Sequence, residues 1–180
     1  MIDSSKSDIG CFLGNVDSGK FPEISRNFLL RAQTLIFDGN RLLGDLGATQ
    51  ISKSFSLLSS LSLTELNLED CDIGDNGIRS LCESLHYNSI LHVLILKANR
   101  KVTSQGFDCI ASLLEINNSI KTIDISQNNL GLSSFIAVLR SLQRNSARVP
   151  TSLSVAYSGI EDSTGLIIKI VSKLMNNQRY

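Results

Sequence analysis

The fold is decided by the stretch LTELNLEDCDI, which occupies residues 63–73. From Leu66 to Leu68 apolar and polar residues alternate, and this period of two is that of a half-buried β-strand. Cys71 follows at the point where the chain must turn, and Ile73 supplies one more apolar side chain. The stretch therefore predicts a short strand whose leucines point into a core and whose end is anchored by Cys71.

The same pattern occurs five times along the 180 residues. Full copies begin at Leu63, Leu91 and Ile120, and weaker copies begin at Ala32 and Leu153. Each copy carries an anchor after its strand, and the anchors are Asn40, Cys71, Asn99, Asn128 and Ser158. They are spaced by 31, 28, 29 and 30 residues. One such unit cannot bury its apolar face alone, so neighbouring units must stack. The anchor side chains are expected to satisfy backbone groups of the adjoining loop.

An apolar set with helical spacing follows each anchor. Its members stand at relative positions 0, +3, +4 and +7, which is one face of an α-helix. The sets are Ala48/Ile51/Ser52/Phe55, Ile78/Leu81/Cys82/Leu85, Phe107/Ile110/Ala111/Leu114, Phe135/Val138/Leu139/Leu142 and Ile167/Ile170/Val171/Leu174. The polar residues just ahead of these sets are predicted as helix N-caps. They are Asp45, Asp75, Ser104, Ser133 or Ser134, and Asp162 or Ser163.

The phrase at residues 73–78, IGDNGI, and the links Leu85-x-x-Asn88-x-x-Leu91 and Leu114-x-x-Asn117-x-x-Ile120 resemble the ribonuclease-inhibitor-like subclass of leucine-rich repeats. The resemblance covers about residues 30–175. It implies an α/β leucine-rich-repeat solenoid, a right-handed horseshoe segment with a parallel sheet on the concave face and helices on the convex face. Within the subclass, the run at 116–126 is most similar to cytoskeletal members, the capping-protein regulators and tropomodulin.

The domain organisation follows from the same pattern. We expect a degenerate half-repeat or cap over residues 1–30 and a repeat domain of about five units over residues 31–180. Residues 1–85 carry a net charge of −5, residues 86–139 carry +1 and residues 140–180 carry +4. Because position along a solenoid follows position along the chain, one end is acidic and the other basic. End-to-end association, or docking of one end onto a partner, is therefore expected.

Composition excludes several classes of protein. The 27 leucines, with 42% hydrophobic and 19% charged residues, indicate a globular chain with an aliphatic core. The balance of 17 basic and 17 acidic residues argues against a nucleic-acid or membrane-surface binder. The first ten residues lack the basic flank and apolar stretch of a signal peptide, so a cytoplasmic location is expected. The four cysteines show no CxxC spacing, which argues against a metal site or a disulfide framework.

Motifs that would carry catalysis are incomplete. Residues 14–21, GNVDSGKF, fit a phosphate-binding loop, but Phe21 stands where Mg²⁺ needs a Ser or Thr. His86 and His92 fall in a helix-to-strand link without a nucleophile at a meaningful spacing. The acidic run at 69–72, with Asp75, lacks the alternating ligands of a calcium-binding loop. We therefore expect no enzyme activity, no cofactor and no metal.

Between the buried leucines, three residues of each strand should face the concave side. Apolar side chains at Ile36, Val93 and Ile95 would lie there beside carboxylates, a surface suited to a partner segment with some basic character. The residues predicted to contact that protein partner are Glu65, Asn67, Glu69, Val93, Ile95, Lys97 and Asp124. The predicted function is a non-catalytic scaffold or adaptor. The alternative is a GTPase-activating regulator of a small GTPase, with the basic loop tip at 100–101 as its candidate site.

Overall fold

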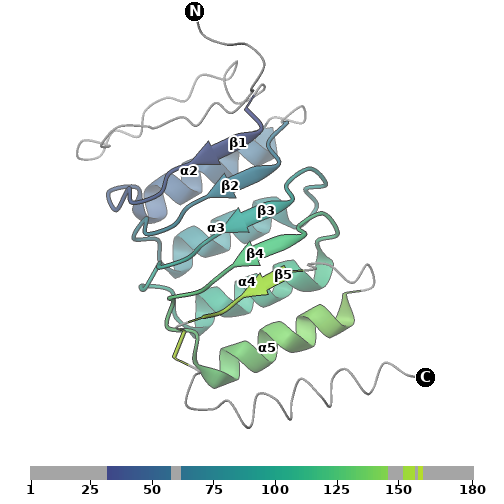
Figure 1. Ribbon diagram of the computed structural model, residues 1–180. Helices are drawn as coiled ribbons and strands as arrows, with labels where there is room; N and C mark the ends of the chain where they lie inside the picture. The colour runs from purple at the N-terminus through teal and green to yellow at the C-terminus, as the bar shows by residue number, and fades with distance from the viewer. Residues whose placement is uncertain (1–31, 58–61, 146–151, 157, 160–180) are drawn as a thin grey trace, which may run out of the picture.

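In the computed structural model, the described residues are 32–57, 62–145, 152–156 and 158–159. Strand and helix alternate along them, and Figure 1 shows the strands side by side in one layer with the helices behind them. The strands are β1 (Thr34–Ile36), β2 (Glu65–Asn67), β3 (Val93–Ile95), β4 (Thr122–Asp124) and β5 (Ser152–Ser154). The helices are α2 (Gly44–Leu57), α3 (Asp75–Leu85), α4 (Ser104–Ile116) and α5 (Gly131–Arg144).

The sheet is parallel, and its strand order β1-β2-β3-β4-β5 is the order in the chain. This arrangement is that of an α/β leucine-rich-repeat solenoid, so the predicted fold class is confirmed. Four of the five predicted helices lie within the described residues. The fifth, with its expected cap at Asp162 or Ser163, lies outside them, as do the half-repeat over residues 1–30 and the phosphate-loop pattern at 14–21.

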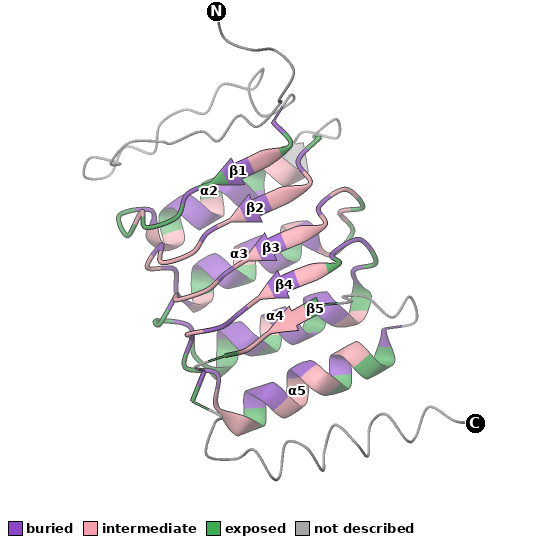
Figure 2. Ribbon diagram, in the orientation of Figure 1, coloured by how far each residue is buried: buried purple, intermediate pink, exposed green. Residues whose placement is uncertain are grey.

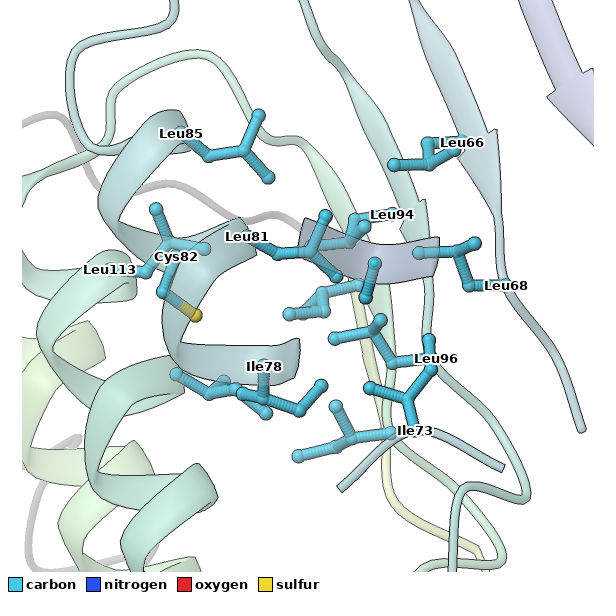
Figure 3. Packing of buried hydrophobic residues seen from close by; sticks show 14 of the residues in the cluster. Leu66, Leu68, Ile73, Ile78, Leu81, Cys82, Leu85, Leu94, Leu96 and Leu113 are labelled. Carbon is cyan, nitrogen blue, oxygen red and sulfur yellow. The ribbon is translucent and has the colours of Figure 1, made fainter. Parts of the chain in front are cut away.

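The core lies between the sheet and the helices. The middle residue of each of β1 to β4 is at most 2% exposed. In β2, β3 and β4, Figure 2 shows this buried segment flanked by half-buried ones, whereas in β1 the residue that follows it is exposed. These residues are Leu35, Leu66, Leu94 and Ile123. Figure 3 shows the leucines of β2 and β3 facing Ile78, Leu81 and Leu85 of α3. Burying an aliphatic side chain of this size stabilises the fold by about 1.5–3 kcal/mol, and one unit cannot bury its apolar face without its neighbours.

The predicted N-caps at Asp45 and Asp75 are wrong in one respect, because each carboxylate caps the helix of the next repeat. Asp45 Oδ1 accepts hydrogen bonds from the N–H groups of Gly74 at 2.7 Å and Gly77 at 3.1 Å, at the start of α3. Asp75 Oδ1 accepts from Thr103 N–H at 2.8 Å and Gly106 N–H at 3.0 Å, at the start of α4. Both aspartates lie in the first turn of their own helices, past the N-cap position from which a side chain accepts the first free N–H groups.

The serine caps were also misplaced. The N-cap of α4 is Thr103, whose hydroxyl accepts from Gln105 N–H, and Ser104 is already the first residue of the helix. The N-cap of α5 is Leu130, which provides no side-chain hydrogen bond, and Ser133 and Ser134 lie within the helix. At the start of α5 a backbone carbonyl therefore takes the place of a hydroxyl: Gly131 N–H donates to the carbonyl of Ser158 at 3.4 Å.

Candidate partner-binding site

The loops that frame the concave face are held by the anchor residues. Asn99 is fully buried, and its Oδ1 accepts from the N–H groups of Cys71 at 3.1 Å and Ile73 at 3.0 Å. Its Nδ2 donates to the carbonyls of Leu68 at 2.8 Å and Leu96 at 3.0 Å. Because an amide both donates and accepts, a single side chain ties the loop of one repeat to the strand end of the next.

The anchors Asn40, Cys71 and Ser158 also hold backbone carbonyl groups. Asn40 Nδ2 donates to Phe37 O at 2.9 Å, and the Cys71 thiol donates to the same carbonyl at 3.1 Å. Burial raises the pKa of the Cys71 thiol to about 12, which keeps it protonated and able to donate. Ser158 Oγ lies 3.4 Å from the carbonyl of Ile125.

Asn128 repeats only half of the Asn99 arrangement. Its Nδ2 donates to Leu96 O at 3.1 Å and Ile125 O at 2.9 Å, but its buried Oδ1 has no hydrogen-bond partner among the described residues. The preceding loop runs from Asn99 to Val102, one residue longer than the turn from Cys71 to Ile73. Val102 N–H therefore closes its own turn on Asn99 O at 3.1 Å and does not reach Asn128.

A second ladder of asparagines lies at the opposite edge, in the helix-to-strand links. Asn117 Nδ2 donates to Leu85 O at 2.7 Å and Asn88 O at 2.9 Å. Asn145 repeats this geometry one unit on, with bonds to Leu114 O and Asn117 O. In the sequence, two of these links indicated only a family resemblance. Their recurrence at Asn88, Asn117 and Asn145 was the signal of a structural role.

The strand register brings the predicted contact residues together on the concave face. Glu65 pairs with Val93, and Asn67 pairs with Ile95, which pairs in turn with Asp124. Glu69 and Lys97 extend the same alignment by one row, since Asp70 N–H donates to Lys97 O at 2.9 Å. All seven predicted residues are half-buried, and Ile36 beside them is 39% exposed.

Only some of the charged side chains on this face form ion pairs. Lys97 Nζ lies 2.6 Å from Glu69 Oε1, and the hydrogen bond that Lys97 donates to this carboxylate is the main reason that the pKa of Lys97 is raised. Asp124 Oδ1 accepts from Ser126 N–H at 2.8 Å, and Asn67 Oδ1 accepts from Glu69 N–H at 2.9 Å. Within the described residues, Asp38, Glu65 and Asp124 have no ion-pair partner.

The acidic run at 69–72 is matched by basic side chains of both neighbouring repeats. Asp70 pairs with Arg41 at 2.9 Å, and Asp72 pairs with Lys101 at 2.5 Å. The predicted basic loop tip is thereby reduced to Arg100, which is exposed. Across the described part of the chain, no group of three or more His, Cys, Asp or Glu side chains is placed to hold a metal ion. The helices of that part are also too short or too polar to span a membrane.

Comparison with known proteins identifies related repeats. A family model described as Leucine Rich repeat matches residues 59–82. The chain is 36% identical over 92 residues to a ribonuclease inhibitor from Sus scrofa, across 51% of this chain and 20% of that protein. It is 28% identical over 127 residues to the Rho GTPase-activating protein gacW from Dictyostelium discoideum, across 67% of this chain and 11% of that protein. The matched part is thus a fifth or less of the length of these relatives.

Among solved structures, the chain is similar to leiomodin-1 actin-binding site 2. The TM-score is 0.64 at 13% sequence identity, and the superposition covers 86% of this chain and 87% of that one. At this identity the similarity concerns the fold, a parallel sheet backed by helices.

Proposed function

We propose that this chain, a leucine-rich-repeat protein of the ribonuclease-inhibitor-like type, is a non-catalytic scaffold or adaptor that binds a protein partner through its concave face. The observation that carries the proposal is the juxtaposition of Val93 and Ile95 with Glu65 and Asp124 on adjacent strands. An apolar centre bordered by polar groups is the general composition of a protein interface.

Charge indicates the chemistry of the partner segment. The three rows of the concave face hold four carboxylates and one ammonium group, and Lys97 neutralises Glu69. Asp38, Glu65 and Asp124 therefore leave the face acidic on both sides of the apolar centre. A segment with lysine or arginine around one or two apolar residues complements this pattern, and the opposite charges would speed its association.

We place the partner in the cytoplasm and in a cytoskeletal assembly. The resemblance of residues 116–126 to cytoskeletal members and the shared fold with leiomodin-1 actin-binding site 2 support this part of the proposal. The charge gradient along the chain, from −5 to +4, supports docking of the solenoid through its ends as well. Sedimentation at low and high salt tests the latter: self-association through the ends weakens as salt rises, and a salt-independent monomer contradicts it.

The concave-face proposal is tested by affinity capture followed by cross-linking mass spectrometry, with the captured partner then titrated against variants. Glu65→Lys should lower affinity about tenfold or more, because it places a cation against the basic segment. Glu83→Lys is the matched control, since Glu83 is an exposed carboxylate on α3 in the helical layer. Glu69 is unsuitable for this purpose because its reversal also breaks the ion pair with Lys97. Equal loss in both variants, or no loss at Glu65, refutes binding at this face.

The second candidate function is regulation of a small GTPase. It is favoured by the similarity to the Rho GTPase-activating protein gacW and by the exposed Arg100 at a loop tip, the kind of group that stabilises charge in GTP hydrolysis. Phosphate release from a purified small GTPase, with and without this chain, separates the two functions. An activator accelerates release, and Arg100→Ala then removes the acceleration. An unchanged rate rejects this candidate.

A further inference from the structure

A hollow of about 320 Å³ opens at the edge where the helix-to-strand links lie, away from the concave face. It is formed by the link between α3 and β3 and the link between α4 and β4. Its volume is at the lower end of the range for ligand sites. The lining side chains that bear on its chemistry are His86, Tyr87, Ser89, His92, Ile116 and Lys121.

The hollow is built on a rigid backbone. Asn88 Oδ1 accepts from the N–H groups of Ile90 at 3.0 Å and Leu91 at 2.8 Å, which fixes the first link. Ser119 Oγ donates to Asn88 O at 2.8 Å and joins the second link to the first. Since both walls are tied together, the hollow exists before any ligand arrives, and binding would not have to order it.

Its polar lining favours a negatively charged group. Among the described residues that line the hollow there is no carboxylate, whereas there are two imidazoles and one ammonium group. The contact between His92 Nδ1 and the carbonyl of Ile90 holds the imidazole ring in place. Ser89 and Asn118 add a hydroxyl and an amide that can donate to oxygen.

Its rim is apolar and unusually exposed. Tyr87 is 88% exposed and Ile116 is 42% exposed, and both are among the few large hydrophobic residues of the described chain that face solvent. The Tyr87 ring meets His86 edge-on, with ring centroids 6.3 Å apart and an interplanar angle of 74°. A ligand that brings one apolar side chain next to its charge would cover this rim.

We propose that the hollow is a second binding site, which takes an acidic peptide segment with an aliphatic residue next to its carboxylates. The carboxylates of the peptide lie against Lys121 and the imidazole rings of His86 and His92. Its aliphatic side chain covers Tyr87 and Ile116. The concave face prefers the opposite charge, so the two sites select different segments. The proposal stands independently of what the concave face binds.

The test uses the full chain, labelled with ¹⁵N, and a blocked tetrapeptide, acetyl-Glu-Leu-Glu-Glu-amide. Its neutral counterpart, acetyl-Gln-Leu-Gln-Gln-amide, has the same size and shape. The acidic peptide should shift amide resonances of the two links in a saturable way. Lys121→Gln and Tyr87→Ser should each raise Kd about threefold, the scale of an exposed charge pair or a partly covered ring. Both residues are exposed, so the fold tolerates the changes.

Arg100→Gln is the matched control, because it also removes one exposed positive charge but lies in a strand-to-helix loop. It should leave Kd unchanged. Equal shifts with the neutral peptide would overturn the proposal. So would an equal loss in Arg100→Gln, or shifts confined to residues outside the two links.

Discussion

Replacing Asp75 by alanine would test the principle that helix caps in this solenoid come from the preceding repeat. The Asp75 carboxylate accepts three hydrogen bonds from the next unit: from Thr103 N–H at 2.8 Å, from the Thr103 hydroxyl at 2.6 Å and from Gly106 N–H at 3.0 Å. Asp75→Ala removes all three acceptors and leaves the first turn of α4 uncapped from that side.

The expected loss of stability is about 2 kcal/mol. Loss of an N-cap aspartate costs about 1 kcal/mol, and hydrogen bonds to a charged group contribute about 1.5–3 kcal/mol each but are not additive. Because Asp75 is half-buried, we expect the total loss of stability to lie near the lower end of the range for hydrogen bonds to a charged group. In a domain of this length, 2 kcal/mol lowers Tm by roughly 6 °C.

The loss depends on pH with a defined sign. Burial acts to raise the pKa of Asp75, but the hydrogen bonds from Thr103 and Gly106 outweigh it and hold the pKa below its ordinary value. A depressed folded-state pKa stabilises the fold above the unfolded-state pKa of about 3.9. The stabilisation is lost as pH falls through the folded value. The gap between wild type and Asp75→Ala should therefore be full at pH 7 and should narrow below about pH 4.

Urea denaturation at pH 7 and pH 3 measures the gap. Asp108→Ala is the control, because Asp108 is an exposed carboxylate on α4 and should change stability by less than about 0.5 kcal/mol. A double-mutant cycle adds Gly106→Ala, whose Cβ would stand 2.6 Å from Asp75 Oδ1 and 2.6 Å from Val102 Cγ1. Part of the destabilisation caused by Gly106→Ala should disappear in the double variant, which lacks the Asp75 carboxylate. Equal losses in Asp75→Ala and Asp108→Ala, or a gap that widens in acid, would refute the reasoning.

Three further predictions concern the anchored loops. Asn99→Ala should destabilise the protein by about 3 kcal/mol in urea titrations, because four buried backbone groups lose their hydrogen-bond partner. Asn129→Ala is the control and should leave stability nearly unchanged, because Asn129 is exposed. The Cys71 thiol, buried and with its pKa raised to about 12, should react with iodoacetamide at pH 8 only after denaturation, as mass spectrometry would show; rapid labelling of the folded chain would contradict this. Ala98 has a φ of +61°, so Ala98→Gly should raise stability by about 0.5 kcal/mol, and a fall in Tm would count against relief of strain.

The strands and their alignment were predictable because one local period generates them. Leucines at fixed spacing in each copy require the same depth in the core, so the register Glu65–Val93–Thr122 follows from aligning the copies. The helices were predictable for the same reason, since each apolar quartet must meet those leucines. A regular stack translates distance along the chain into distance in space.

The caps were not predictable in this way. Asp45 and Asp75 lie just ahead of their own helical sets in sequence, yet their carboxylates serve helices about 30 residues further on. The N–H groups of Gly77 and Gly106 donate to these carboxylates, and nothing in the repeat pattern distinguished the two glycines. Each is required because a Cβ there would stand within 2.7 Å of the aspartate oxygen.

The sequence by itself determined the solenoid, its period, its aliphatic core and which residues face the concave side, because these depend on repeated local spacing. Only the tertiary structure decided how the polar groups are shared. It neutralises Glu69 with Lys97 and leaves Asp38, Glu65 and Asp124 without an ion pair among the described residues. It also closes two links around a hollow whose described lining contains no carboxylate. The physical reason is that hydrogen bonds and charge pairs are satisfied between neighbouring repeats, by side chains that a linear pattern does not bring together.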